Sequence, residues 1–218
     1  MRKQRARCSE GLRKGQTIMH ELISDIILHE WNQFDQVQNE GGRAGCQDDW
    51  KTFRIMRSSQ FQEWPKELLT SYLNDLIDAE SRGWNMITEK YARMMKSTAP
   101  ARYAELEPSL PARSRGRLAA QEEIIAIETD WNEEFHRAFP RYSSGSRLIR
   151  TEDDTPYETS AETYLRGELT TYSDQTFALY ADMVRGLQAA GRSRAYDVAQ
   201  NIARQYGYTS LEELEALL

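Results

Sequence analysis

Apolar side chains recur at steps of three and four residues along most of the chain, which is the spacing of one face of an α-helix. Few stretches alternate polar and apolar residues, and β-branched residues are sparse. The clearest stripe lies within residues 17–39 and consists of Met19, Ile23, Ile26, Ile27, Trp31, Phe34 and Val37. The pattern therefore predicts a chain that is helical almost throughout.

A run of glycines separates the first two predicted helices. The first helix should extend from Thr17 to Asn39, because glycine is the usual residue just after a helix end and glycines follow at 41 and 42. The second should start near Gln47. Asp48 and Asp49 would then lie in its first turn, close to the positive end of the helix dipole.

Proline and glycine also separate the later helices. Pro65 suits the first position of a third helix, which Gly83 ends. Prolines at 100, 108 and 111 break the next stretch into a loop with at most one short helix, and residues 140–159 form the longest irregular stretch. Further helices are predicted at about residues 85–97, 114–138, 160–169, 174–190 and 194–206, and from residue 210 onward. We expect an all-α fold, a single globular domain of about seven to eight helices spanning residues 16–218.

Composition narrows the class of protein. The 218 residues are 39% hydrophobic and 28% charged, enough apolar material for one sizeable core. The net charge of −6 argues against a nucleic-acid-binding protein, whose surface should be basic. No apolar run approaches the length of a membrane-spanning helix. Two cysteines, Cys8 and Cys46, are too few for a disulfide framework, so we expect both to be reduced in a cytoplasmic protein.

Basic residues are concentrated before residue 16. They are Arg2, Lys3, Arg5, Arg7, Arg13 and Lys14. The apolar segment of a secretory signal does not follow them. We expect residues 1–15 to form a flexible, solvated leader; the alternative is contact with an acidic partner or nucleic acid.

Two carboxylates fall on apolar stripes. Glu30 lies on the stripe of the first predicted helix, and Glu128 lies between Ile124 and Trp131 on the fifth. A buried carboxylate has to be paired, protonated or bound to a metal. If the two helices pack together, these carboxylates can approach each other or share an arginine. We expect them to be catalytic; the alternative is that each reaches water at the edge of its stripe or forms a structural ion pair.

The glycine break itself is the second candidate. Three glycines among residues 41–45 allow backbone N–H groups to converge, and Arg43 adds donors, as in an anion site. The stretch lacks the Gly-Lys-Ser/Thr and GxGxxG patterns of phosphate loops, and the alternative is a tight turn between helices. From this region we expect Asp48 to join the catalytic carboxylates. The predicted ligand-binding residues are Asn39, Arg43, Gln47, Arg57, Arg93 and Arg166, the last three as anion clamps.

Other chemistries have weaker patterns. Glu133-x-x-His136 has the spacing of di-iron bundles, but those sites need two such motifs and only one is present. Cys46 precedes a helix start, which favours a thiolate, but no histidine is near it in sequence. A carboxylate site for Mg²⁺ or Mn²⁺ remains open, with candidate ligands Glu30, Asp35, Glu40, Asp48 and Asp49. Residues 157–173 are dense in hydroxyls and are a candidate second wall of a polar pocket. No cofactor or metal is identified.

Several longer motifs resemble one bacterial family. They are NEGGRA at 39–44, CQDD at 46–49, IMRSSQF at 55–61, EKYARMM at 89–95 and ETYLRGEL at 162–169. Together they are similar to the DUF4125 family over residues 18–214. That family is named for lacking a known function. The resemblance also implies a nucleotide-linked or small-molecule-modifying setting, because some members look fused to a domain of the nucleotidyltransferase type.

Two main functional hypotheses follow, besides a nucleic-acid binder that would act through the N-terminal basic residues. The first is a cytoplasmic bacterial enzyme that acts on a small polar or anionic metabolite in a helix-lined pocket with inward carboxylates and arginines. The alternative is a non-catalytic helical partner module for a nucleotidyltransferase-like or other protein. Neither hypothesis involves nucleic acid or a membrane. The substrate, the reaction and the oligomeric state do not follow from the residues.

Overall fold

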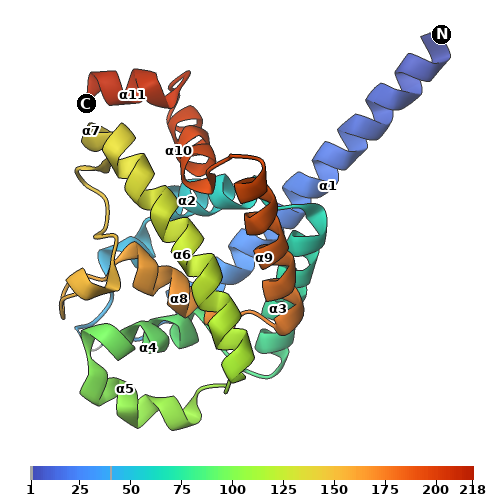
Figure 1. Cartoon of the computed structure of the whole chain (residues 1–218). Helices are drawn as coiled ribbons and strands as arrows, with labels where there is room; N and C mark the ends of the chain where they lie inside the picture. Colours follow the sequence, from blue (N-terminus) through green and yellow to red (C-terminus); the bar gives the residue numbers. More distant parts are fainter. Residues whose placement is uncertain (1, 40) are drawn as a thin grey trace.

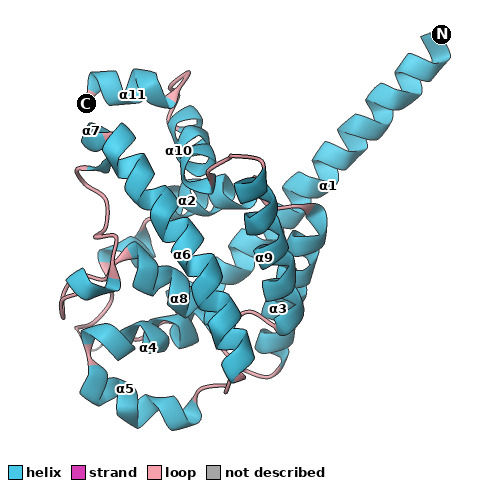
Figure 2. Ribbon diagram, viewed as in Figure 1, coloured by secondary structure: helices cyan, strands magenta, loops and turns pink. Residues whose placement is uncertain are grey.

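Helices account for nearly all of the regular structure of the chain (Figures 1 and 2). The computed structural model describes the backbone of residues 2–39 and 41–218 and the side chains of residues 15–39 and 41–218. The α-helices are α1 (Arg2–Asp35), α2 (Trp50–Phe61), α3 (Lys66–Ser81), α4 (Met86–Thr98), α5 (Pro100–Leu106), α6 (Arg115–Ala138), α7 (Pro140–Ser143), α8 (Ala161–Thr171), α9 (Asp174–Ala189), α10 (Arg194–Gln205) and α11 (Leu211–Leu217). Three short 3₁₀ helices are η1 (Gly45–Asp48), η2 (Glu107–Ser109) and η3 (Thr151–Asp153). No strand occurs in this described part, so the all-α prediction is confirmed.

The predicted number of helices is wrong: the described backbone forms eleven α-helices rather than seven to eight. Pro100 and Pro140 begin two short helices in stretches predicted to be mainly irregular. Proline fits the first helical turn, where its missing N–H would have no partner in any case. The periodicity does not reveal these helices because they are short; α5 buries no residue.

The first helix ends at Asp35, before the predicted Asn39. The Gln47 side chain stabilises this earlier end: its Nε2 donates to the carbonyl oxygens of Phe34 at 2.9 Å and Val37 at 3.1 Å. The last carbonyls of a helix have no partner within the helix, so a side chain that supplies donors there acts as a cap. The end of α1 is therefore set by a residue of the following segment.

The second helix begins at Trp50 rather than near Gln47. Asp49 is its N-cap, and its carboxylate accepts from the backbone N–H of Thr52 at 3.0 Å. The preceding residues form η1 instead. Gly42 adopts a φ of 86°, a left-handed conformation that favours glycine, which explains one glycine of the break.

The core lies where α3, α6, α8 and α9 come together. α3 packs against α1 and α9, α6 packs against α8 and α9, and α10 contacts both α2 and α6. Fully buried side chains at the centre are Ile26, Phe61, Leu68, Leu69, Leu76, Ile124, Leu169 and Val184. None of the described helices is long and apolar enough to cross a membrane.

Helices α4 and α8 approach each other closely at Gly167. A Cβ atom at this position would lie 2.9 Å from the carbonyl oxygen of Lys90 and 3.0 Å from Cγ of Met94. Glycine is therefore required by packing rather than by backbone conformation. The contact matters for the site because Lys90 on α4 and Glu168 on α8 flank it.

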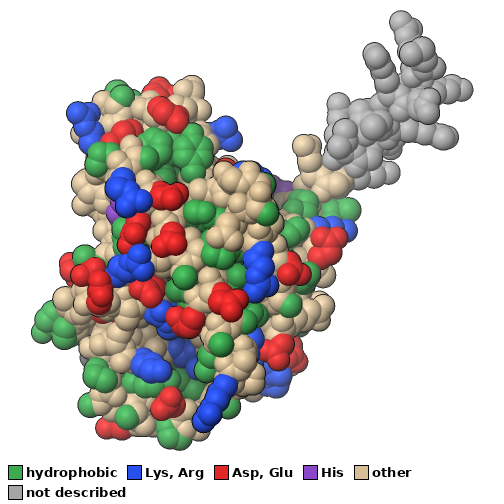
Figure 3. All heavy atoms as spheres, in the orientation of Figure 1, with side chains coloured by type: hydrophobic (Ala, Val, Ile, Leu, Met, Phe, Trp, Pro, Cys, Tyr) green, Lys and Arg blue, Asp and Glu red, His purple; other side chains and the backbone are tan. Residues whose placement is uncertain are grey.

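Acidic and basic side chains are interspersed over the face seen in Figure 3 rather than separated by sign. Typical surface pairs are Arg166 with Glu122 and Arg150 with Glu133. The side chains of residues 1–14 lie outside the described part of the chain. The expected basic leader over residues 1–15 therefore stays a prediction.

Candidate functional site

A cavity of about 660 Å³ lies among α1, α2, α4, α6, α8 and α10. Aromatic and aliphatic side chains form much of its wall, and charged groups interrupt them. The polar or charged lining residues include Glu30, Arg57, Gln60, Lys90, Glu128, Asn132, His136, Arg147, Tyr164, Glu168 and Arg194. A concave, largely apolar space with a few convergent polar groups is the usual form of a small-molecule site.

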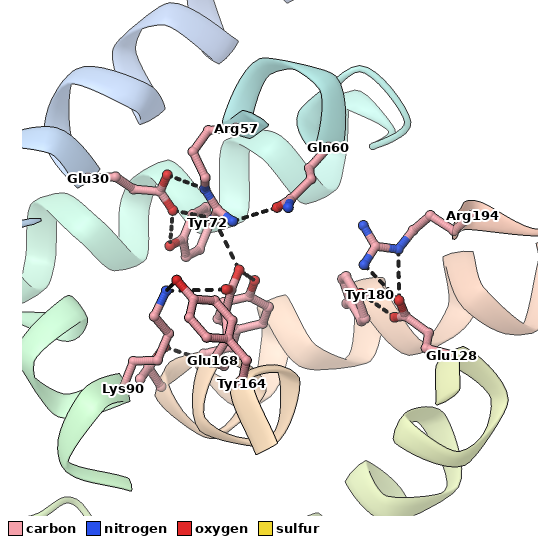
Figure 4. Close-up of polar contacts among 12 residues, drawn as sticks. Glu30, Arg57, Gln60, Tyr72, Lys90, Glu128, Tyr164, Glu168, Tyr180 and Arg194 are labelled. Atoms are coloured by element: carbon pink, nitrogen blue, oxygen red, sulfur yellow. Dashed lines mark hydrogen bonds and ion pairs between the residues drawn. The ribbon is translucent and has the colours of Figure 1, made fainter. Parts of the chain in front are cut away.

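Glu30 and Arg57 form the most buried ion pair of the cavity. Glu30 is 0% exposed, as its place on the apolar stripe of α1 predicts. Arg57 on α2 donates to both oxygens of this carboxylate, through Nε at 2.7 Å and Nη2 at 2.5 Å. Arg57 Nη2 also donates to Glu168 at 3.0 Å, and Nη1 donates to Gln60 at 2.5 Å. All three guanidinium nitrogens of Arg57 are thus engaged by groups of the protein (Figure 4).

Glu168 on α8 lies between two cations. Arg57 contacts one of its oxygens, and Lys90 Nζ lies 3.5 Å from the other. Burial alone would raise the pKa of Glu168, but the positive charges of Arg57 and Lys90 outweigh burial and lower the pKa to about 2. Glu168 is therefore a permanent anion that joins α2, α4 and α8.

Glu128 forms a second cluster at another part of the cavity. Arg194 at the start of α10 donates to Oε2 of Glu128 through Nε at 2.9 Å and Nη2 at 2.7 Å. The hydroxyl of Tyr180 on α9 donates to the other carboxylate oxygen. Glu128 is 5% exposed, so it faces inward as its stripe on α6 predicts. The two predicted carboxylates line one cavity but are held by different arginines (Figure 4).

Three buried tyrosines each donate a hydrogen bond to one carboxylate. Tyr72 donates to Glu30 at 2.8 Å, Tyr172 donates to Glu168 at 3.0 Å, and Tyr180 donates to Glu128. Burial, together with the adjacent carboxylates, raises the pKa of each tyrosine well above its ordinary value. These hydroxyls therefore remain protonated and serve as fixed donors.

Tyr164 is the exception among the tyrosines of this region. Its hydroxyl accepts from the ammonium group of Lys90 at 3.0 Å, and the same ammonium lies 4.2 Å from the centre of its ring. Burial would raise the pKa of Tyr164, but the nearby positive charge of Lys90 outweighs it and the pKa is lowered. Lys90 itself is only 5% exposed.

Sequence reasoning did not select Lys90, Tyr164, Glu168 or Arg194 as site residues. Tyr164 and Glu168 belong to the hydroxyl-rich stretch 157–173, and they are one helical turn apart, so they share a face of α8. This spacing on one helix face is the pattern by which the sequence could have indicated Tyr164 and Glu168 as site residues. No such pattern indicates Lys90, because a lysine on a helix is usually solvated.

The polar residues of the glycine break bind one another. Gln47 Oε1 accepts from Asn39 at 3.0 Å and from the backbone N–H of Ala44 at 2.9 Å. Arg43 pairs with Asp35 at 2.5 Å and with Asp48 at 2.9 Å, all three being exposed. Asn39, Arg43, Gln47 and Asp48 are not among the residues that line the cavity. Their contacts are those of a helix cap and a tight turn.

The two remaining predicted anion clamps also have partners within the protein. Arg93 donates to Glu89 at 2.8 Å and to the carbonyl of Pro111 at 2.6 Å. Arg166 donates to Glu122 at 2.8 Å and to Glu162 at 2.7 Å. Neither lines the cavity, and only Arg57 of the three predicted clamps does.

Side chains suited to metals or to nucleophilic attack are dispersed. Among the described residues, no three His, Cys, Asp or Glu side chains are grouped so that they could hold a metal ion. Glu40, one of the candidate ligands, lies outside the described residues. Glu133 pairs with Arg150 at 2.6 Å and not with His136. Cys46 is an exposed free thiol at the edge of the cavity.

Comparison with known proteins places this geometry in a family without assigning it a chemistry. Neither a search of curated proteins nor a search of solved structures gave a match to the chain. The family model described as protein of unknown function DUF4125 matches residues 20–216. The match covers all of the residues that line the cavity, and it confirms the resemblance of the longer motifs. The chain therefore belongs to the DUF4125 family.

Proposed function

We propose that this protein is a cytoplasmic bacterial enzyme that binds a small polar metabolite with an anionic group in the cavity among α1, α2, α4, α6, α8 and α10. The observation that carries the proposal is the density of buried charge around one cavity. Three carboxylates, Glu30, Glu128 and Glu168, face it together with Arg57, Lys90 and Arg194.

Such an interior is costly for a fold that needs only stability. A buried ion pair repays its desolvation only when its geometry is good, and an apolar core of similar volume is often as stable or more stable. Clusters of buried titratable groups with shifted pKa values are concentrated at functional sites. The large and opposite pKa shifts of Glu168 and Tyr172 are of this kind.

An anionic ligand suits the positive charge at the cavity that no carboxylate of the described residues neutralises. Arg147, in the loop between α7 and α8, lines the cavity. No carboxylate among the described side chains pairs with it; its Nη1 lies 3.5 Å from the carbonyl of Thr159. Asn132 and His136 on α6 also line the cavity, with no hydrogen bond to the described residues. These side chains have free donors to offer a carboxylate or phosphate.

A binding screen tests the proposal. Phosphorylated and carboxylated metabolites are added to the purified chain, and the melting temperature is followed. A compound present at 100 times its Kd should stabilise the folded state by about 2.7 kcal/mol. Arg147→Gln should weaken binding of the hits. Arg185→Gln removes an exposed arginine of α9 that does not line the cavity, and should leave binding unchanged.

Turnover separates an enzyme from a binding protein. Each hit is incubated with the protein and followed by NMR. New resonances that depend on intact Arg147 support the enzyme. Tight binding with no conversion of any hit argues for a binding protein. A screen in which no compound raises the melting temperature argues against the proposal as a whole.

A second candidate function is a partner module, and a separate surface supports it. A groove of about 1410 Å³ runs between α1, α2 and the end of α10. Its apolar lining is Met19, Ile23, Ile27, Leu28 and Trp50, of which Leu28 is 50% exposed. Exposed apolar grooves of this kind often bind another protein. A nucleotidyltransferase-type protein is the partner to test.

Co-purification with that partner distinguishes the two candidates. Leu28→Glu places a charge in the groove and should abolish a complex formed there. Leu118→Glu changes a comparably exposed leucine of α6 outside the groove and should not. A complex that both variants form equally well is not held at this groove.

A further inference from the structure

The four tyrosines nearest the buried charges fall into two chemical classes. Tyr72, Tyr172 and Tyr180 each donate to a carboxylate, which holds the proton on the phenol oxygen. Tyr164 instead accepts from the ammonium of Lys90. An ammonium has three donors and no acceptor, so the phenol proton of Tyr164 cannot be held by Lys90 and is free to point elsewhere.

The surroundings of Tyr164 favour a negative charge on its oxygen. Lys90 on α4 lies 3.0 Å from the hydroxyl, and the guanidinium of Arg147 lies 4.8 Å from the ring centre. Arg57 on α2 adds a third positive charge, and Glu168, one turn along α8, is the opposing anion. Tyr91 packs edge-on with its ring centre 6.3 Å away. Cations therefore outnumber anions around this phenol.

The proton affinities agree with this arrangement. Burial raises the pKa of Tyr91, and the neighbouring Tyr164 raises it further, so Tyr91 keeps its proton. Burial lowers the pKa of Lys90, but Tyr164 and Glu168 outweigh burial and the net change is upward. Lys90 therefore holds its proton more tightly than an ordinary lysine, and Tyr164 loses its proton more readily than an ordinary tyrosine.

We propose that Tyr164 is the proton-transferring group of the cavity, positioned by its hydrogen bond from Lys90, for a ligand that places an O–H or N–H group against Tyr164 and its anionic group against Arg147. This inference rests on the proposed function, because it assigns a role within the same cavity. Tyrosine with a lowered pKa is one of the side chains suited to general acid–base work.

The step needs no further reactant. The phenolate oxygen of Tyr164 takes the proton from the ligand O–H or N–H, whose bonding electron pair stays on the ligand oxygen or nitrogen. Tyr164 becomes a neutral phenol, and the ligand gains one negative charge. Lys90 remains an ammonium throughout and donates its hydrogen bond to whichever form of Tyr164 is present. The reverse transfer returns the proton to the ligand.

Ultraviolet difference spectroscopy of the protein without any ligand tests the acidity. We expect one tyrosine to ionise at a pH clearly below the ordinary value of about 10. Tyr164→Phe should remove that early transition. Tyr157→Phe is the matched control, because Tyr157 is 96% exposed and should contribute only an ordinary transition. An early transition that persists in Tyr164→Phe, or none in the wild type, overturns the proposal.

Lys90 is tested by the same titration. Lys90→Gln should move the transition of Tyr164 upward by at least one pH unit, a tenfold change in acidity. If circular dichroism shows that this variant does not fold, Arg147→Gln takes its place, since it alters an exposed side chain and should give a smaller upward shift. A transition that is unmoved in the folded variant overturns the role of Lys90.

Kinetics then test the transfer itself on any ligand that the binding screen identifies. General acid–base groups contribute roughly 10²- to 10⁴-fold to a rate. Tyr164→Phe should lower kcat by that factor with Kd nearly unchanged, and it should remove the ionisation of Tyr164 from the pH–rate profile. A variant that turns over at the wild-type rate overturns the catalytic role. Failure of the screen would instead count against the proposed function, since the titration needs no ligand.

Discussion

Glu30 and Glu128 face the same cavity but do not contact each other. Arg57 binds the first and Arg194 the second. Between them the rings of Tyr72, Tyr172 and Tyr180 form a row, with neighbouring ring centres 5.0 Å and 6.0 Å apart.

This row separates the two charged ends of the cavity, and its members Tyr172 and Tyr180 line the cavity as an aromatic floor. Trp64 packs against all three tyrosines, at 5.5 to 6.1 Å between ring centres, and its buried indole N–H has no hydrogen-bond partner among the described residues. An unsatisfied buried donor costs about 1–3 kcal/mol. A ligand or water oxygen bound over the floor would relieve that cost.

Arg57→Met should destabilise the fold strongly. The guanidinium pairs with both Glu30 and Glu168. The variant therefore leaves two buried carboxylates without the positive charge of Arg57 beside them. Removing one partner of a buried ion pair costs about 3–5 kcal/mol. Urea denaturation measures the loss. Arg43→Met breaks two ion pairs whose members are exposed and should change the free energy of unfolding very little. Equal effects of the two variants would contradict the assigned burial of Arg57.

Stability should fall as the pH drops below the ordinary range of glutamate. The pKa of Glu168 is lowered from 4.5 to about 2 in the folded state, so the stabilisation is complete above 4.5 and is lost as the pH falls toward 2. The difference corresponds to roughly 3 kcal/mol. The free energy of unfolding can be measured by urea denaturation at a series of pH values from 6 to 2. It should therefore fall less steeply with decreasing pH in Glu168→Gln than in the wild type. Parallel profiles would show that Glu168 does not carry the effect.

The periodicity of the sequence was sufficient for the main helices and for the direction of the two stripe carboxylates. Ile23, Ile27 and Phe34 indicate which face of α1 points inward, and Glu30 lies on the same face. The end of α1 and the start of α2 were misplaced because they depend on hydrogen bonds that the Gln47 side chain donates and the Asp49 side chain accepts. Side-chain caps of this kind leave no trace in a hydrophobic pattern.

The set of residues that meet at the cavity was less predictable, because these residues lie far apart along the chain. Arg57 meets Glu168 across 111 residues, and Lys90 meets Tyr164 across 74. One sequence does not show which of its many charged residues become buried neighbours. The glycine break attracted attention by its density of polar groups, but those groups satisfy one another locally.

Gln47→Ala should cost stability without affecting the cavity. The buried amide makes four hydrogen bonds, two of which cap α1. Leaving buried polar partners unsatisfied costs about 1–3 kcal/mol. Gln38→Ala, which alters an exposed glutamine of the same turn, should have almost no effect on urea denaturation. If Gln47 instead contacted a ligand, as the sequence predicted, the variant would weaken binding of the screen's hits. The structure leads us to expect unchanged Kd values.

Gly167→Ala should be destabilising, against the usual preference of helices for alanine. In a helix interior this change ordinarily gains about 0.5–1 kcal/mol. Here the new methyl group would lie 2.9 Å from the carbonyl oxygen of Lys90, which belongs to the backbone of α4 and cannot rotate away. Overpacking of this kind costs typically 1–3 kcal/mol, so we expect a net loss.

Gly186→Ala in α9 is the matched control for this position. A Cβ at Gly186 would have no atom within 4 Å, so this variant should gain the ordinary helix stabilisation. Thermal unfolding of the two variants should therefore shift in opposite directions. The separation of α4 from α8 should also weaken the hydrogen bond from Lys90 to Tyr164 and raise the pH at which Tyr164 ionises. A Gly167→Ala protein as stable as the Gly186→Ala protein would mean that the two helices are not in close contact there, and the positions assigned to Lys90 and Glu168 would have to be revised.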